Sequence, residues 1–110
     1  MAFKRTQKPT FSTPVTVSIP NERGGFDKST FVARFSRPST DELKALREAG
    51  LTNEDLVRKQ LVGWEMKDED TKEDVPFNEI EVEALLQISP TPYATAQAFW
   101  EAVNGARSKN

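Results

Sequence analysis

Two stretches near the beginning of the chain alternate between apolar and polar residues. In Thr13–Ile19 every second residue is β-branched, and in Ser29–Ser36 two phenylalanines and an alanine share one face. Alternation with a period of two is typical of a strand that is buried on one side. The segment between the two stretches contains Gly24-Gly25, which favours a turn. The sequence therefore predicts an antiparallel hairpin, which needs another layer over its apolar face because a hairpin alone is barely stable.

After this hairpin the spacing of apolar residues becomes helical. Ser39 and Glu42 have the spacing of a capping box, and Gly50 supplies a stop for the first helix. A second helix is expected to begin after Thr52 and to end by Gly63. Its expected buried residues are Leu56, Val57, Leu61 and Val62.

Two further helices are predicted in the last third of the chain. Asn78 has the position of an N-cap, and a helix is expected from there to Gln87. Thr91 is the expected cap of the last helix, with Pro92 at its first position and Gly105 at its end. The apolar face expected for this helix consists of Tyr93, Ala96, Trp100 and Val103, with Phe99 beside them.

The order of these elements predicts the fold class. Strands that come first and helices that follow indicate an α+β fold, with one antiparallel β-hairpin followed by about four short α-helices. A chain of 110 residues is the size of a single domain. We expect residues 1–12 to form a flexible basic arm, 63–76 to form a loop with a short extended piece, and 106–110 to form a short polar tail.

The composition excludes several kinds of functional site. The chain contains no Cys and no His, which removes disulfides, thiolate metal ligands, thiol nucleophiles and the usual general base. No apolar run approaches the length of a membrane span, and no signal-peptide pattern follows the start. Gly24-Gly25 precedes a strand, whereas a phosphate loop opens a helix. We therefore expect a soluble intracellular protein that is not an enzyme and has no cofactor and no membrane partner.

Charge is distributed unevenly along the sequence. Residues 1–40 contain seven Lys or Arg against two Asp or Glu, and 41–110 contain eight against fifteen. Such a chain can steer a charged partner or associate with its own copies, although a solvated surface is the simpler interpretation. The basic half leaves open a small nucleic-acid-binding regulator. The overall pI of about 5.2 argues against nucleic acid as the main partner.

The densest acidic stretch is a candidate metal site because of its carboxylates, but it does not match a calcium-binding loop. Residues 65–83 hold nine carboxylates against two lysines. Aligned with a calcium-binding EF-hand loop from Asp68, the stretch places Lys72 at a ligand position and Glu73 where the sharp turn needs glycine. We therefore expect no metal ion here.

Several motifs of the second half stand out as an ordered set. They are Leu61-Val62-Gly63-Trp64, Lys67-Asp68-Glu69-Asp70, Val75-Pro76-Phe77-Asn78, Leu85-Leu86 and Ala94–Trp100, followed by the closing residues 105–110. Together they resemble the tail assembly chaperones of long-tailed phages and prophages. The two predicted strands also fit one branch of this group, so the resemblance covers most of 13–110. Thr71 departs from the pattern, because a glycine is expected in the acidic turn.

The resemblance implies a function that composition does not reveal. Proteins of this family bind the long tape measure protein and keep it soluble until the tail tube polymerises around it. In many of them a frameshifted C-terminal extension recruits the tail tube protein. The implied location is the cytoplasm of a host bacterium, and the implied protein is absent from the mature virion. A structural component of the phage head or tail remains the alternative within the same setting.

Large apolar side chains flank the acidic stretch and suggest where a partner binds. Trp is enriched at the centres of protein interfaces, whereas packing in the core is the simpler interpretation of any Trp in a chain this small. Our hypothesis for the partner surface comprises Trp64, Met66 and Phe77, with Asp68, Glu69 and Asp70 as its acidic rim.

Overall fold

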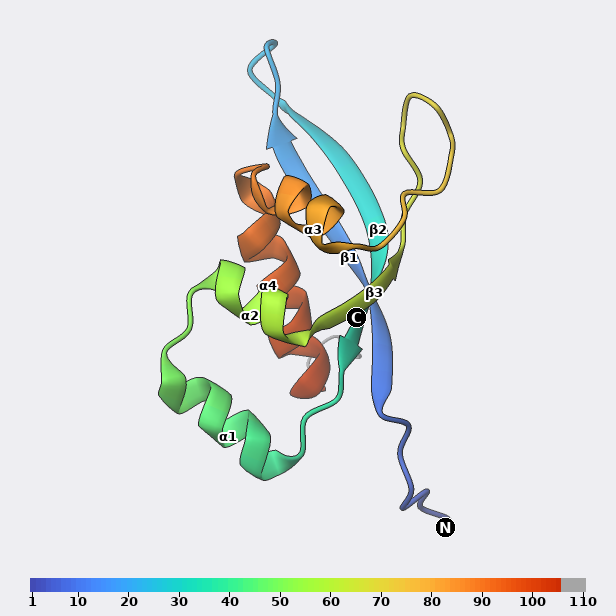
Figure 1. Ribbon diagram of the computed structural model, residues 1–110, viewed down its shortest axis with the longest axis vertical. Coiled ribbons are helices and arrows are strands. Elements are labelled where there is room, and N and C mark those ends of the chain that lie inside the picture. The colour runs from blue at the N-terminus through green and yellow to red at the C-terminus, as the bar shows by residue number, and fades with distance from the viewer. Residues whose placement is uncertain (106–110) are drawn as a thin grey trace.

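A computed structural model describes residues 1–105 of the chain and confirms the predicted α+β class (Figure 1). Strands β1 (Thr10–Pro20) and β2 (Phe26–Ser36) form the expected hairpin. A third strand, β3 (Leu61–Glu65), pairs with β2, so the antiparallel sheet has the order β1-β2-β3. Val15 lies opposite Phe31 in the hairpin, and both side chains are buried. The alternation in the sequence therefore identifies the covered face of the sheet.

The hairpin turn is built by one asparagine and one glycine. The Asn21 side-chain oxygen accepts hydrogen bonds from the backbone N–H groups of Arg23 and Gly25. Gly24 has a φ of 83°, in the left-handed region that favours glycine. The tip of the hairpin extends beyond the helices (Figure 1).

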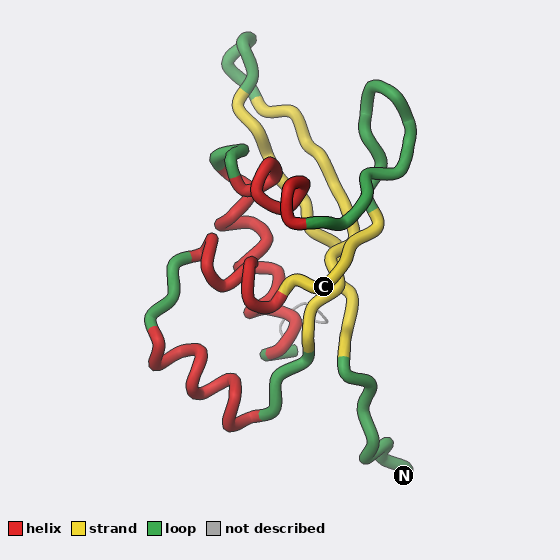
Figure 2. The backbone as a smooth tube through the Cα atoms, in the orientation of Figure 1, coloured by secondary structure: helices red, strands yellow, loops and turns green. Residues whose placement is uncertain are grey.

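Four helices gather on one side of the sheet (Figure 2). They are α1 (Thr40–Ala49), α2 (Asn53–Gln60), α3 (Glu79–Leu86) and α4 (Pro90–Val103). Three of the four predicted caps are confirmed, because side-chain oxygens accept hydrogen bonds from the first turns of α1, α2 and α3. Each cap satisfies a backbone N–H that the helix itself leaves free. The capping residues are Ser39, Thr52 and Asn78.

The core lies between the sheet and α4. Phe99 of α4 is fully buried, and its ring centroid lies 5.2 Å from that of Phe35 on β2 and 6.1 Å from that of Phe11 on β1. Helix α4 packs on β1 and, on its other side, contacts α2. The buried apolar residues are Val15, Val17, Phe31, Ala33, Phe35, Leu46, Leu56, Val57, Leu61, Val82, Leu86, Ala96, Ala98 and Phe99.

The third strand corrects the prediction that the second helix carries Leu61 and Val62, because both residues belong to β3. Helix α2 ends at Gln60, and Leu61 already has extended backbone angles. Val62 and Gly63 are weak helix formers, and pairing with β2 supplies the hydrogen bonds that a further helical turn would give. Gly63 lies opposite Arg34, and a Cβ at this position would lie 2.5 Å from the Arg34 guanidinium. The extended piece predicted within 63–76 is therefore confirmed at 63–65, where β3 ends.

The last helix begins earlier than predicted and leaves Tyr93 outside its buried face, whereas Ala96 and Phe99 are buried as predicted. It starts at Pro90 after Ser89, which makes no side-chain cap, so Thr91 is not the cap. Tyr93 is 62% exposed, whereas Thr91 and Thr95 are fully buried. The buried face of α4 thus includes these two threonines, and the Tyr93 phenol faces solvent.

The two termini also bear on the predictions. Strand β1 begins at Thr10 instead of Thr13, and Phe11 packs against the core, so the arm that precedes the sheet is residues 1–9. The expected polar tail at 106–110 lies outside the described residues.

One buried hydroxyl in the core leads to a test of the packing. The Thr95 Oγ1 has no hydrogen-bond partner, and the side chain is completely buried. We expect Thr95→Val to raise the free energy of unfolding by about 1 kcal/mol, because valine keeps the shape and removes the unsatisfied oxygen. Thr95→Ser keeps the hydroxyl, loses the methyl group and should be less stable than the wild type. Urea unfolding measures both, and a destabilised valine variant would contradict this account of the α4–β1 contact.

Candidate partner-binding surface

Trp64 fixes the end of the acidic loop, residues 66–75, to the sheet. Trp64 belongs to β3 and lies opposite Ala33 of β2. Its indole N–H donates a hydrogen bond of 2.9 Å to the Val75 carbonyl. Its ring contacts Phe77 edge-on, with centroids 4.9 Å apart, and Phe31 at 6.2 Å. Because the side chain is half-buried and its one polar group is paired, Trp64 acts first as packing beneath the loop.

The two ends of the acidic loop run antiparallel and pair with each other. The Val75 N–H donates to the Met66 carbonyl at 2.9 Å, and the Lys67 ammonium lies 2.7 Å from an Asp74 carboxylate oxygen. A bridge between the backbones of Lys67 and Asp74 closes the pair. The loop projects from the body of the molecule beside the hairpin (Figure 1).

Asp68 organises the tip of this loop. One of its carboxylate oxygens accepts hydrogen bonds from the backbone N–H groups of Thr71 and Asp70. These bonds lower the pKa of the Asp68 carboxyl, the bond from Thr71 having the larger effect. The residue with a left-handed backbone is Lys72, with a φ of 65°, and not Thr71, where the family pattern expects glycine.

The structure brings only part of the hypothetical surface together. Trp64 and Phe77 are in contact, and Met66 is half-buried against the core. The three carboxylates of the rim, Asp68, Glu69 and Asp70, are exposed on the loop. Among residues 1–105 no group of three or more carboxylates is placed to hold a metal ion.

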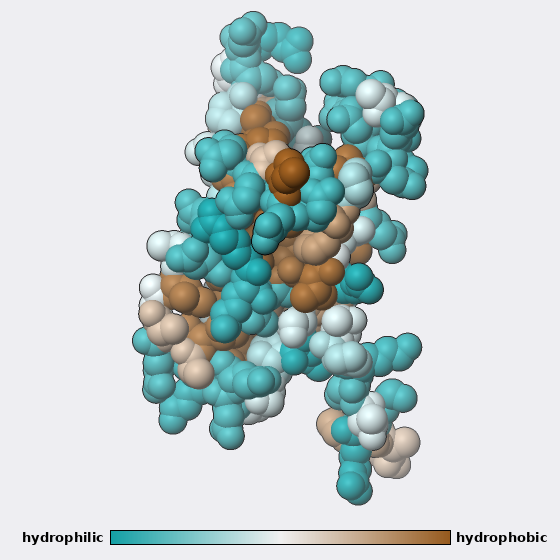
Figure 3. Space-filling model, in the orientation of Figure 1, coloured by the Kyte–Doolittle hydropathy of each residue, from teal (hydrophilic) through white to brown (hydrophobic). Residues whose placement is uncertain are grey.

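An open apolar groove lies where α3 faces the junction of α2 and β3. Its volume is about 610 Å³. Phe77 is 39% exposed and Ile80 is 80% exposed at its border, whereas Leu61 and Val82 are buried beneath it. Hydrophobic surface gathers between these elements on the face drawn in Figure 3. The remaining lining residues are Arg58, Asn78, Glu79 and Glu83.

Sequence reasoning identified Phe77 but missed Ile80 and Leu61. Leu61 was assigned to a helix, so its place below the groove could not be foreseen. The sequence does indicate that Ile80 is exposed, because it lies on α3 away from the buried Val82 and Leu86. An isoleucine outside the buried stripe of a short capped helix is a candidate contact residue.

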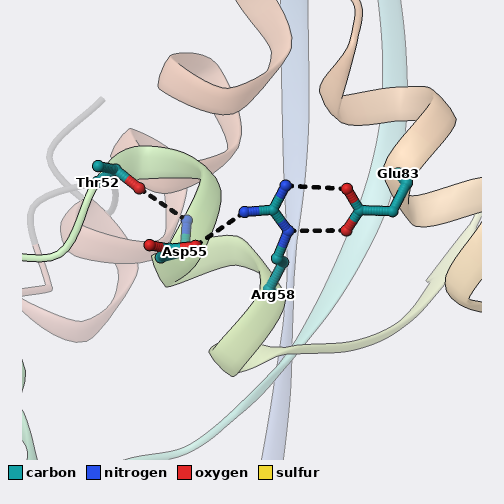
Figure 4. A network of polar contacts seen from close by, with 4 residues as sticks. All are labelled: Thr52, Asp55, Arg58 and Glu83. Carbon is teal, nitrogen blue, oxygen red and sulfur yellow. Dashed lines mark hydrogen bonds and ion pairs between the residues drawn. The ribbon is translucent and has the colours of Figure 1, made fainter.

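One ion-pair network holds α3 against α2 beside the groove (Figure 4). The Arg58 guanidinium donates two hydrogen bonds to the Glu83 carboxylate, at 2.7 and 2.9 Å, and a third to Asp55 at 2.8 Å. These hydrogen bonds raise the pKa of Arg58 above its ordinary value and lower the pKa of the Glu83 carboxyl. Thr52 caps the helix that carries both Asp55 and Arg58.

Two of the seven basic residues in the first half, Arg34 and Arg37, lie against other parts of the chain, and the other five are exposed. Arg37 lies over the Phe11 ring, 5.4 Å from its centroid, and donates to the Lys8 carbonyl. Phe11 packs against the core and is not free to stack on a base. Arg34 lies over Gly63 on the uncovered face of the sheet.

Comparison of the chain with protein-family models, with curated proteins and with solved structures found no match. Within residues 1–105 no helix is long and apolar enough to span a membrane. The surface is therefore interpreted from its own geometry and from the resemblance of its motifs.

The Arg58–Glu83 pair predicts a pH-dependent contribution to stability. Because the folded-state pKa of Glu83 is lowered, chiefly by its hydrogen bonds to Arg58, this contribution is present above the ordinary pKa. It is lost as the pH falls through the lowered folded-state value. In ¹³C NMR titrations we expect Glu83 to titrate at lower pH in the wild type than in Arg58→Gln. Equal midpoints would mean that the pair is not formed in solution.

Proposed function

We propose that this chain is a phage tail assembly chaperone that binds the tape measure protein and keeps it soluble during tail morphogenesis. The observation that carries the proposal is the open apolar groove bordered by Phe77 and Ile80. A protein that holds an aggregation-prone client needs exposed apolar side chains on a charged surface, as transient interfaces have. The ordered motifs of the second half supply the link to this particular client.

The proposed client surface revises the hypothesis drawn from the sequence. Phe77 and Ile80 make the direct apolar contact, and Trp64 supports Phe77 from beneath. The carboxylates at 68–70 keep the occupied complex soluble from their exposed position on the loop. This arrangement matches weak, reversible binding, which allows tail tube protein to displace the chaperone. The proposal places the protein in the host cytoplasm and outside the finished virion.

Co-expression tests this function. A tape measure protein co-expressed with this chain should remain soluble and co-purify with it, and Ile80→Asp should reduce the soluble yield of that long protein several-fold. Ile80 is 80% exposed, so this change leaves the core intact. Tyr93→Asp, at an exposed position on α4, is the matched control and should behave as the wild type.

Other outcomes distinguish the alternative functions. If the long protein is indifferent to this chain, the chaperone function is wrong. Presence of the chain in purified particles would instead identify a structural head or tail component. Binding to DNA or RNA that falls steeply between low and moderate salt would identify a nucleic-acid-binding regulator.

A further inference from the structure

The first nine residues form an exposed basic arm. Met1 and Phe3 are exposed, Phe3 to 84%, and the arm carries three cationic side chains and no carboxylate side chain. Its base is fixed, because the Arg37 backbone N–H donates to the Pro9 carbonyl at 2.8 Å and its Nε donates to the Lys8 carbonyl at 2.9 Å. From this anchor the arm runs away from the helices (Figure 1).

The apolar groove has the complementary properties. Phe77 and Ile80 border it, and two carboxylates, Glu79 and Glu83, line it. Helix α3 carries three glutamates and no basic residue. The one cation in the lining, Arg58, is paired with Glu83 and Asp55, so its charge and that of Glu83 are offset within the same chain, and Glu79 is the lining carboxylate left to face an incoming cation. An incoming segment with an aromatic side chain and cations suits this surface.

We propose that the arm of one copy docks in the groove of a second copy. Phe3 fills the apolar groove between Phe77 and Ile80, and the neighbouring cations, Lys4 and Arg5, face the glutamates of α3. The contact forms between copies because the arm points away from the half of its own chain that holds α3 (Figure 1).

This contact joins two different surfaces, so a bound pair still offers one free arm on one copy and one free groove on the other. Such head-to-tail contacts produce rings or open chains instead of closed symmetric dimers. The inference needs no client. A bound client segment would compete with the arm for the same groove, and self-association would then decrease as the client binds.

Sedimentation of the full chain tests the proposal. The average mass should rise with protein concentration at low salt and fall as salt is added. Lys4→Glu with Arg5→Glu should weaken association about tenfold or more, because both charges then repel the groove. Arg23→Glu with Lys28→Glu makes the same change in net charge at the hairpin and should leave association intact.

The groove is tested in the same way and then by mixing. Ile80→Lys should abolish association, and Tyr93→Lys should not. The arm variant with Lys4→Glu and Arg5→Glu keeps an intact groove, whereas the Ile80→Lys variant keeps an intact arm. An equimolar mixture of these two should form one-to-one dimers that do not grow further, since only one contact remains possible.

Three results would overturn the proposal. The first is a chain that stays monomeric at every concentration, including one in which the arm folds onto its own groove. The second is association that both the arm variant and the Ile80→Lys variant retain. The third is a mixture of the two variants that forms no dimer although each variant is folded by circular dichroism.

Discussion

The fold depends on covering one apolar face of a hairpin. Two long strands bring phenylalanine, valine and alanine to the same side, and this surface is unstable in water until another layer packs on it. Helix α4, the last element of the chain, is that layer, with Phe99 against Phe35 and Phe11. The first and last elements are thus joined in one core, and the other helices are arranged around α4.

Local signals in the sequence account for much of this architecture. The hairpin and the caps of α1, α2 and α3 were predictable, because alternation and capping depend on residues close together in the chain. The two predictions that were wrong, for β3 and for Tyr93 on α4, have a common cause. Strand β3 forms because β2 offers it a free edge, and the face of α4 that is buried depends on the sheet on which the helix packs. Both outcomes depend on partners distant in sequence.

The candidate surface also combines features that the local sequence predicts with features that depend on distant parts of the chain. Phe77 could be identified from its large side chain beside an acidic stretch, but the role of Trp64 could not. Its indole lies between the sheet and the returning loop, with a hydrogen bond that only the folded chain defines. The groove itself requires β3 beneath α3, so a prediction that lacked β3 could name one border residue but not the cavity.

The construction of the acidic loop has a consequence for how this chain tolerates change. Its hydrogen bonds join loop residues to one another, from Asp68 at the tip to the paired backbones of Met66 and Val75. Trp64 marks the boundary between this unit and the sheet. The tip is therefore a module, and its length and charge can vary, or a foreign peptide can be inserted there, while the packing beneath it stays the same.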